Sequence, residues 1–92
     1  MIKSFAHKGL ELFHRTGRTK GIQAIHAKRL HQILTMLEAA KTVEDMGAPG
    51  LKLHPLNGAR KDIWSVTVKA NWRITFRFEA GDAEIVNYED YH

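Results

Sequence analysis

The sequence contains no cysteine, which excludes disulfide bonds, a thiolate nucleophile and zinc sites built on cysteine. It has no apolar run near the roughly 18 residues of a membrane span, and its opening, MIKSF, lacks the long apolar core of a signal peptide. These absences predict a cytoplasmic protein that does not contact the membrane. Repeats, low-complexity tracts and long Pro/Gly linkers are also missing, so we expect one domain, 1–92.

Positive charge is in excess along the chain. Fourteen Lys and Arg against ten Asp and Glu give a net charge of +4 and a pI of about 9.6, which suggests a nucleic-acid partner. Between Lys52 and Arg77, six cations accompany a single acid, Asp62, whereas four acids lie between residues 82 and 90. This distribution alone fits a solvated basic surface as well as it fits an RNA-binding surface.

The first half of the chain has helical spacing. Residues 2–5 are expected to form a short strand, and residues 8–14 a two-turn helix that ends before Gly17. A longer helix is predicted over 22–40, where apolar residues recur every three or four positions and Arg29 interrupts them. Its expected inward residues are Ile22, Ile25, Ile33, Met36, Leu37 and Ala40.

The second half has the alternating period of β-strands. After a turn at 46–50, alternation begins at residues 51–54, and further strands are predicted over 64–69, 72–79 and 83–88. The sequence therefore predicts an α+β fold, with an N-terminal helix pair on one face of a mostly antiparallel sheet of four or five strands. The opposite face is expected to be open and positive, carrying Lys52, His54, Ser65, Thr67, Lys69, Arg73 and Arg77.

The side chains on that face suggest RNA cleavage without a metal. Such cleavage needs a base for the 2′-hydroxyl, an acid for the leaving 5′-oxygen, and cations for the phosphate. His54 suits one proton role, and the ending Asp90-Tyr91-His92 offers groups for the other, while Arg73 and Arg77 lie on one side of a strand. From spacing alone, the simpler explanation is a surface histidine, a frayed terminus and solubilising charges.

Aromatic and histidine side chains could also stack on RNA bases or bind a metal. Trp64, Trp72, Phe76 and Phe78 occupy the apolar alternation, so we expect them in the core and not in a base-stacking platform. Tyr91 lies among polar groups and could stack on a base. The remaining histidines do not have the i, i+4 spacing of a helical metal site, so neither a metal nor another cofactor is expected.

Five ordered segments resemble the HigB branch of the RelE superfamily of toxins. They are residues 1–10 (MIKSFAHKGL), 53–58 (LHPLNG), 64–68 (WSVTV), 71–76 (NWRITF) and 87–92 (NYEDYH). The resemblance covers essentially the whole chain. It implies a RelE-like fold, translation-dependent mRNA cleavage in the A site of the 70S ribosome beside 16S rRNA, and neutralisation by a HigA-type helix-turn-helix antitoxin. Contact with DNA would be indirect, through that antitoxin.

By position, the resemblance places the family's catalytic residues on His54, Asp90, Tyr91 and His92 and its phosphate-binding arginine on Arg73. It leaves open which residue is the base. Asn57 departs from the family, since relatives often have lysine there; asparagine can hydrogen-bond a phosphate without supplying charge. Lys52, Arg60 or Lys61 could compensate. The candidate RNA-binding residues are Lys52, Asn57, Arg60, Lys61, Lys69, Asn71, Arg73 and Arg77.

Three functional hypotheses follow. The first is a ribosome-dependent endoribonuclease, part of a type II toxin-antitoxin system, that forms a 2′,3′-cyclic phosphate. The second is a non-catalytic RNA or ribosome binder that blocks translation by occupancy, in which case His54 and His92 would be dispensable. An antitoxin-like DNA binder is disfavoured, because no recognition-helix motif follows the long helix.

Overall fold

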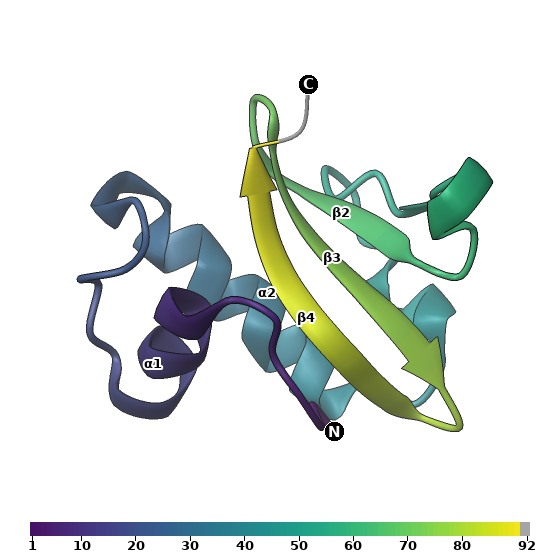
Figure 1. The fold of residues 1–92 in the computed structure, drawn as a ribbon, viewed down its shortest axis with the longest axis horizontal. Helices are drawn as coiled ribbons and strands as arrows, with labels where there is room; N and C mark the ends of the chain where they lie inside the picture. The colour runs from purple at the N-terminus through teal and green to yellow at the C-terminus, as the bar shows by residue number, and fades with distance from the viewer. Residues whose placement is uncertain (91–92) are drawn as a thin grey trace.

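The computed structural model of the chain describes residues 1–90, and Tyr91 and His92 lie outside the described residues. Two α-helices pack on a four-stranded antiparallel sheet whose strand order, β1-β2-β3-β4, follows the sequence (Figure 1). The predicted α+β class is confirmed. The elements are α1 (Lys8–Thr16), α2 (Ala27–Ala39), β1 (His54–Pro55), β2 (Trp64–Lys69), β3 (Trp72–Glu79) and β4 (Asp82–Asp90).

Helix α1 has a cap at each end. The Nδ1 atom of His7 accepts a hydrogen bond of 3.0 Å from the N–H of Leu10, and Gly17 ends the helix with a left-handed φ of 79°. Leu10 and Phe13 are buried, as predicted. Within residues 1–90, no helix combines the length and apolarity needed to cross a bilayer.

Helix α2 begins later than the predicted start at residue 22. The 3₁₀ turn η1 (Ala24–His26) precedes it and has three residues per turn, so the phase of the inward face differs from that of a continuous α-helix. His26 is therefore buried, whereas Ile25 is 74% exposed, and its predicted inward position was wrong. The buried residues of α2 are Leu30, Ile33, Leu34 and Leu37.

The core lies between α2 and one face of the sheet. Val66, Ile74 and Phe76 are fully buried there, with Val86 from β4 beside them. Trp64, Trp72 and Phe78 are half-buried against the same cluster, which confirms that these rings pack on the core. β4 extends two residues beyond the predicted end, and this extension brings Glu89 and Asp90 into the sheet.

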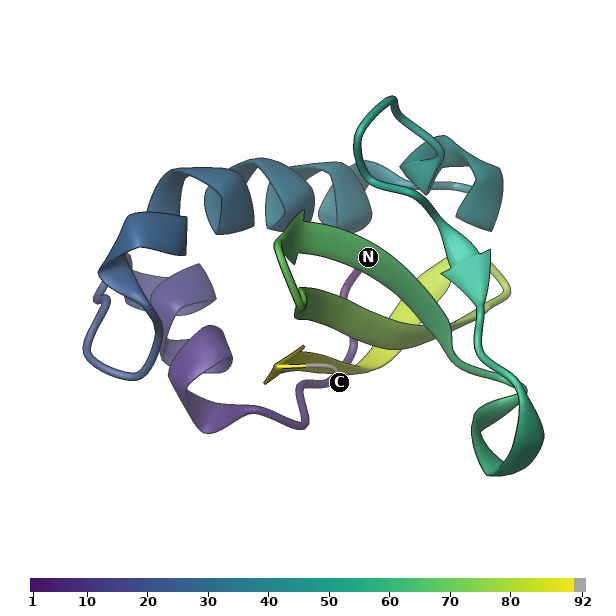
Figure 2. The ribbon, with the colours of Figure 1, turned by 90° about the horizontal axis from the view of Figure 1, so that it is seen from above.

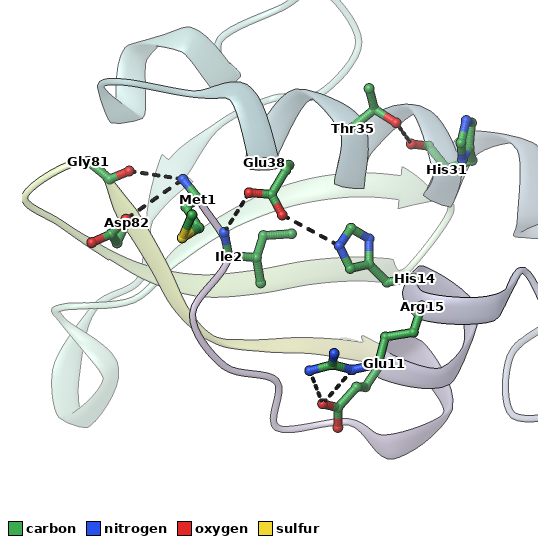
Figure 3. A network of polar contacts seen from close by, with 10 residues as sticks. All are labelled: Met1, Ile2, Glu11, His14, Arg15, His31, Thr35, Glu38, Gly81 and Asp82. Atoms are coloured by element: carbon green, nitrogen blue, oxygen red, sulfur yellow. Dashed lines mark hydrogen bonds and ion pairs between the residues drawn. The ribbon is translucent and has the colours of Figure 1, made fainter.

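The N-terminal segment runs parallel to β4 as two isolated bridges, Ile2↔Ala83 and Phe5↔Val86, in place of the predicted strand at 2–5. Between the bridges, Ile85 has a left-handed φ of 47°, and the β3–β4 register shifts there as a β-bulge. The segment is also tied to α2, because Glu38 accepts a hydrogen bond of 3.2 Å from the N–H of Ile2 and lies 3.6 Å from Nε2 of His14 (Figure 3).

The α1–α2 connection and the 3₁₀ turn η3 (Gly58–Arg60) lie at opposite ends of the molecule (Figure 2). Two contacts hold the connection in place. His26 Nδ1 lies 2.6 Å from the Tyr88 hydroxyl, and burial, with Lys69 nearby, lowers the pKa of His26. Gly9 and Gly21 pack backbone against backbone, so closely that a Cβ on Gly9 would lie 2.4 Å from the Gly21 oxygen.

This glycine contact gives a direct test of the fold. Gly9→Ala is expected to lower the free energy of unfolding by about 1–3 kcal/mol, because the added methyl meets backbone atoms that must shift as a unit. Urea denaturation would measure the change, with Lys8→Ala at the exposed preceding position as the control. A stabilised Gly9→Ala variant, as expected of Gly→Ala in an open helix, would contradict the packing described.

Candidate functional site

The sheet face opposite the core carries polar side chains in register. His54, Ser65, Thr75 and Asn87 form one row across the four strands, since each pairs with the next in the ladder. Ser65 and Thr75 are only 2% exposed. The middle of this polar face is therefore largely shielded from solvent, and its accessible groups lie at the edges of the sheet.

Glu89 is the hub of the polar face. Its carboxylate accepts two hydrogen bonds from the Arg60 guanidinium, at 3.1 and 2.6 Å, one of 2.5 Å from the Thr75 hydroxyl and one of 3.4 Å from the Asn87 amide. Arg60, and then Thr75, hold the pKa of Glu89 below its usual range against the opposing effect of burial. Glu89 is thus an ionised group at neutral pH.

The expectation of an open, positive face was wrong. β4 places its acids directly opposite the cations of β3, in the register pairs Arg77↔Glu84 and Arg73↔Glu89. Arg77 donates to Glu84 at 3.1 and 2.6 Å, and this carboxylate raises the pKa of Arg77. Paired charges therefore cover much of the surface that the sequence suggested would be free to hold phosphates.

The Arg73 guanidinium folds back toward the β2–β3 turn. Its Nη1 donates to the carbonyls of Ala70 and Trp72, at 2.5 and 3.1 Å. These two acceptors fix the plane of the guanidinium, while Nε and Nη2 make no hydrogen bond within residues 1–90. A phosphate oxygen approaching this edge would meet N–H donors that are already oriented.

His54 lies exposed in β1, and its ring is oriented by the backbone. Its Nδ1 atom lies 2.8 Å from the Lys52 carbonyl oxygen. Because a carbonyl oxygen only accepts, Nδ1 carries the proton in this contact, and the neutral ring then has its lone pair at Nε2. Lys52 has a φ of 51°, so the extended alternation predicted through residues 51–54 is broken there, and β1 is only two residues long.

Comparison with known proteins identifies the family of this chain over nearly its whole length. The model of a family described as the RelE-like toxin HigB of type II toxin-antitoxin systems matches residues 3–92. The chain belongs to this family. A protein of Proteus vulgaris named Endoribonuclease HigB is 50% identical over 92 residues and is covered completely, as is this chain.

The fold of this HigB-like toxin also matches a solved structure. The crystal structure of a histidine-to-glutamine mutant of YafQ from E. coli superposes with a TM-score of 0.61, covering 96% of this chain and 89% of the other. Identity is 16%, so this likeness concerns the fold alone. The HigB-like toxin therefore has the RelE-like fold that the sequence resemblance implied.

Four of the remaining predicted site residues of the toxin lie around the polar face. Asn57 and Lys61 are exposed on either side of η3, and Lys69 and Asn71 are exposed beside the β2–β3 turn. Asp90 pairs with Trp72, so strand alternation places it on the opposite side of β4 from Glu89. The catalytic assignments to Tyr91 and His92 fall outside the described residues.

Glu89 was missed by the sequence reasoning. In the sequence it is one of four acids between residues 82 and 90. Its even spacing from Asn87 within β4 is a signal for a shared face with that polar side chain. The spacing of five from Glu84 indicates opposite faces for the two acids in a regular strand. The bulge at Ile85 brings both acids to one face, and it contains no glycine that would reveal a bulge in the sequence.

Proposed function

We propose that this toxin is an endoribonuclease that cleaves mRNA in the ribosomal A site without a metal ion. The name of the Proteus vulgaris relative supports the reaction class. The observation that carries the assignment here is His54, exposed at the edge of the polar face with the Lys52 carbonyl fixing its Nδ1 atom. An imidazole with a fixed tautomer and an accessible Nε2 has the properties of a general base.

In the proposed reaction, Nε2 of His54 takes the proton of a ribose 2′-hydroxyl, and the resulting oxygen attacks the adjacent phosphorus. The bond to the 5′-oxygen breaks, that oxygen is protonated, and a 2′,3′-cyclic phosphate remains. Arg73 would donate to the phosphate as charge develops on its oxygens. Asp90, Tyr91 and His92 remain the candidate groups for protonating the leaving oxygen.

Dependence on the ribosome fits the small number of chemical groups. The central hydroxyls of the polar face, Ser65 and Thr75, are buried, so the face offers few groups to orient a single RNA strand. A ribosome holding the codon in place would supply that orientation, which is worth several orders of magnitude in rate. This proposal places the toxin in the cytoplasm, with 16S rRNA and A-site mRNA as its partners.

For the antitoxin, we propose a HigA-type helix-turn-helix protein that binds the outer faces of the N-terminal helices and links the toxin to DNA indirectly. The polar face would then stay available to RNA. A hydrogen-exchange footprint of the complex should show protection on α1 and α2. Protection of Arg73 with exposed helices would contradict this placement.

A primer-extension assay on a defined mRNA, with and without programmed ribosomes, tests the reaction. We expect cleavage only with ribosomes, and its loss in a variant lacking His92, because the terminus would then lack the imidazole proposed to take part in proton transfer. Equal cleavage of free RNA would overturn ribosome dependence.

The competing function is a non-catalytic translation inhibitor. The ion pairs of Arg60 and Arg77, together with Asn57 in place of a lysine, favour it to the extent that they reduce the charge available to phosphates. It predicts blocked translation with intact mRNA. Growth inhibition that survives replacement of His54 would favour this function over the endoribonuclease.

A further inference from the structure

The helical half of the toxin has an excess of positive charge. Residues 12–37 contain five Lys and Arg and no Asp or Glu. On the polar face, by contrast, Arg60 and Arg77 are each bound to a glutamate. The α1–α2 side therefore carries positive charge of its own, apart from the cations that the alternation of the strands placed on the polar face.

We call residues 15–28 the basic lobe. Arg18, Lys20 and Lys28 are exposed there, and none of them pairs with a carboxylate in the part of the chain that the structure describes. Arg15 is partly neutralised by Glu11, 3.0 Å away. Three flexible cations without acidic neighbours are suited to an extended anion, since each one that meets a phosphate releases a condensed counterion.

The position of the basic lobe relates it to the candidate site. His26 contacts the Tyr88 hydroxyl at 2.6 Å and lies 5.7 Å from the Trp72 ring, so the lobe is anchored where β3 begins and β4 ends. Arg73 and Asp90 lie at this same end of the sheet. The contact between Gly9 and Gly21 holds the connection against α1, which reduces the entropy lost when the lobe binds.

We propose that the basic lobe is a second RNA-binding surface, which binds the phosphate backbone outside the cleaved segment. The inference rests on RNA being the substrate of the proposed function. RNA is favoured over an acidic protein segment because the cations border the end of the sheet where Arg73 lies. A strand leaving that edge past the β2–β3 turn would meet the lobe next. The lobe then contributes affinity, and the polar face contributes chemistry.

Salt-dependent binding tests this proposal. The probe is a 2′-O-methyl RNA hairpin, which has no free 2′-hydroxyl and so cannot be cleaved. The test variant combines Arg18→Gln, Lys20→Gln and Lys28→Gln. The control combines Lys3→Gln, Lys8→Gln and Lys41→Gln, all exposed and outside the lobe, so both variants lose three positive charges. Fluorescence anisotropy at several salt concentrations gives the dissociation constant and its salt slope.

We expect the lobe variant to bind about tenfold or more weakly at 100 mM salt and to have a salt slope shallower by about 2–3, one for each lost phosphate contact. The control should change both by much less. Equal changes in the two variants would show that only net charge matters and would overturn the proposal. So would unchanged RNA binding in a lobe variant that loses affinity for the antitoxin, since the lobe would then be a protein interface.

The proposed function fails in a different measurement. If His54 is not catalytic, cleavage by His54→Gln survives whatever the binding data show. If the lobe does not bind RNA, the binding slope is unchanged whatever the effect of His54→Gln. The cleavage rate therefore tests the proposed function, and the salt slope of binding tests the basic lobe, each without the other.

Discussion

Replacing His54 with glutamine is expected to lower the rate of RNA cleavage by about 10²–10⁴-fold, the usual contribution of a general acid or base. Glutamine keeps a polar side chain of similar reach but has no ring nitrogen that can take up and give back a proton. Because His54 is exposed and its only hydrogen bond in the described chain is to the Lys52 carbonyl, the free energy of unfolding should change by no more than about 0.5 kcal/mol.

The measurement is the single-turnover cleavage rate on programmed ribosomes, with thermal unfolding of the same samples. His31→Gln is the matched control, since His31 is also exposed but lies on α2. A His54→Gln variant that cleaves within threefold of the parent would remove His54 from the chemistry. A slow variant that also unfolds easily would point to a structural role instead.

The second large effect is expected at Glu89. Glu89→Ala should lower the free energy of unfolding at pH 7 by about 2 kcal/mol, because it leaves the buried Thr75 hydroxyl without this acceptor and removes the carboxylate that Arg60 binds. The buried hydroxyl accounts for most of this cost. The lost ion pair contributes less, since the Arg60 side chain is 41% exposed and can be hydrated, and salt screens the pair.

This loss should depend on pH in a defined direction. The pKa of Glu89 is depressed in the folded protein, so its charged contacts stabilise the fold above the unfolded pKa, near 4.5, and this stabilisation is lost as pH falls through the folded pKa. In urea denaturation, the difference between parent and variant should therefore shrink as pH falls below about 4.5, by the part that depends on the charge of Glu89. Glu44→Ala, at an exposed position, is the control. A difference that stays constant down to pH 3 would contradict the role of the charge.

The sequence predicted the layers of this fold because hydrophobic period reports directly which face of an element is buried. Leu10 and Phe13 in α1, and Val66, Ile74 and Phe76 in the strands, are buried as their spacing indicated. The predicted inward position of Ile25 was wrong because a 3₁₀ turn shifts which residues face inward, and composition does not show such a turn.

The candidate site was less predictable than the fold. His54 could be found, because a histidine beside a proline on a polar strand face is visible in the sequence. The pairing of Arg77 with Glu84 and the hub at Glu89 could not, since both depend on which residues of β3 and β4 stand opposite each other. That register is shifted by a bulge at Ile85, a residue type that rarely adopts a left-handed φ.

The pairing of the N-terminal segment with β4 sets an order for the folding of the toxin. The N–H of Ile85 donates to Ser4 across 81 positions, and Lys3 donates to Ala83, so residues 3 and 4 are bonded only once residues 83–85 are in place. Closing so long a loop costs entropy that no earlier contact repays. A chain that lacks β4 therefore lacks the Glu89 contacts as well as the bonds that hold its N-terminal segment, so the sheet and this segment are completed in the same step.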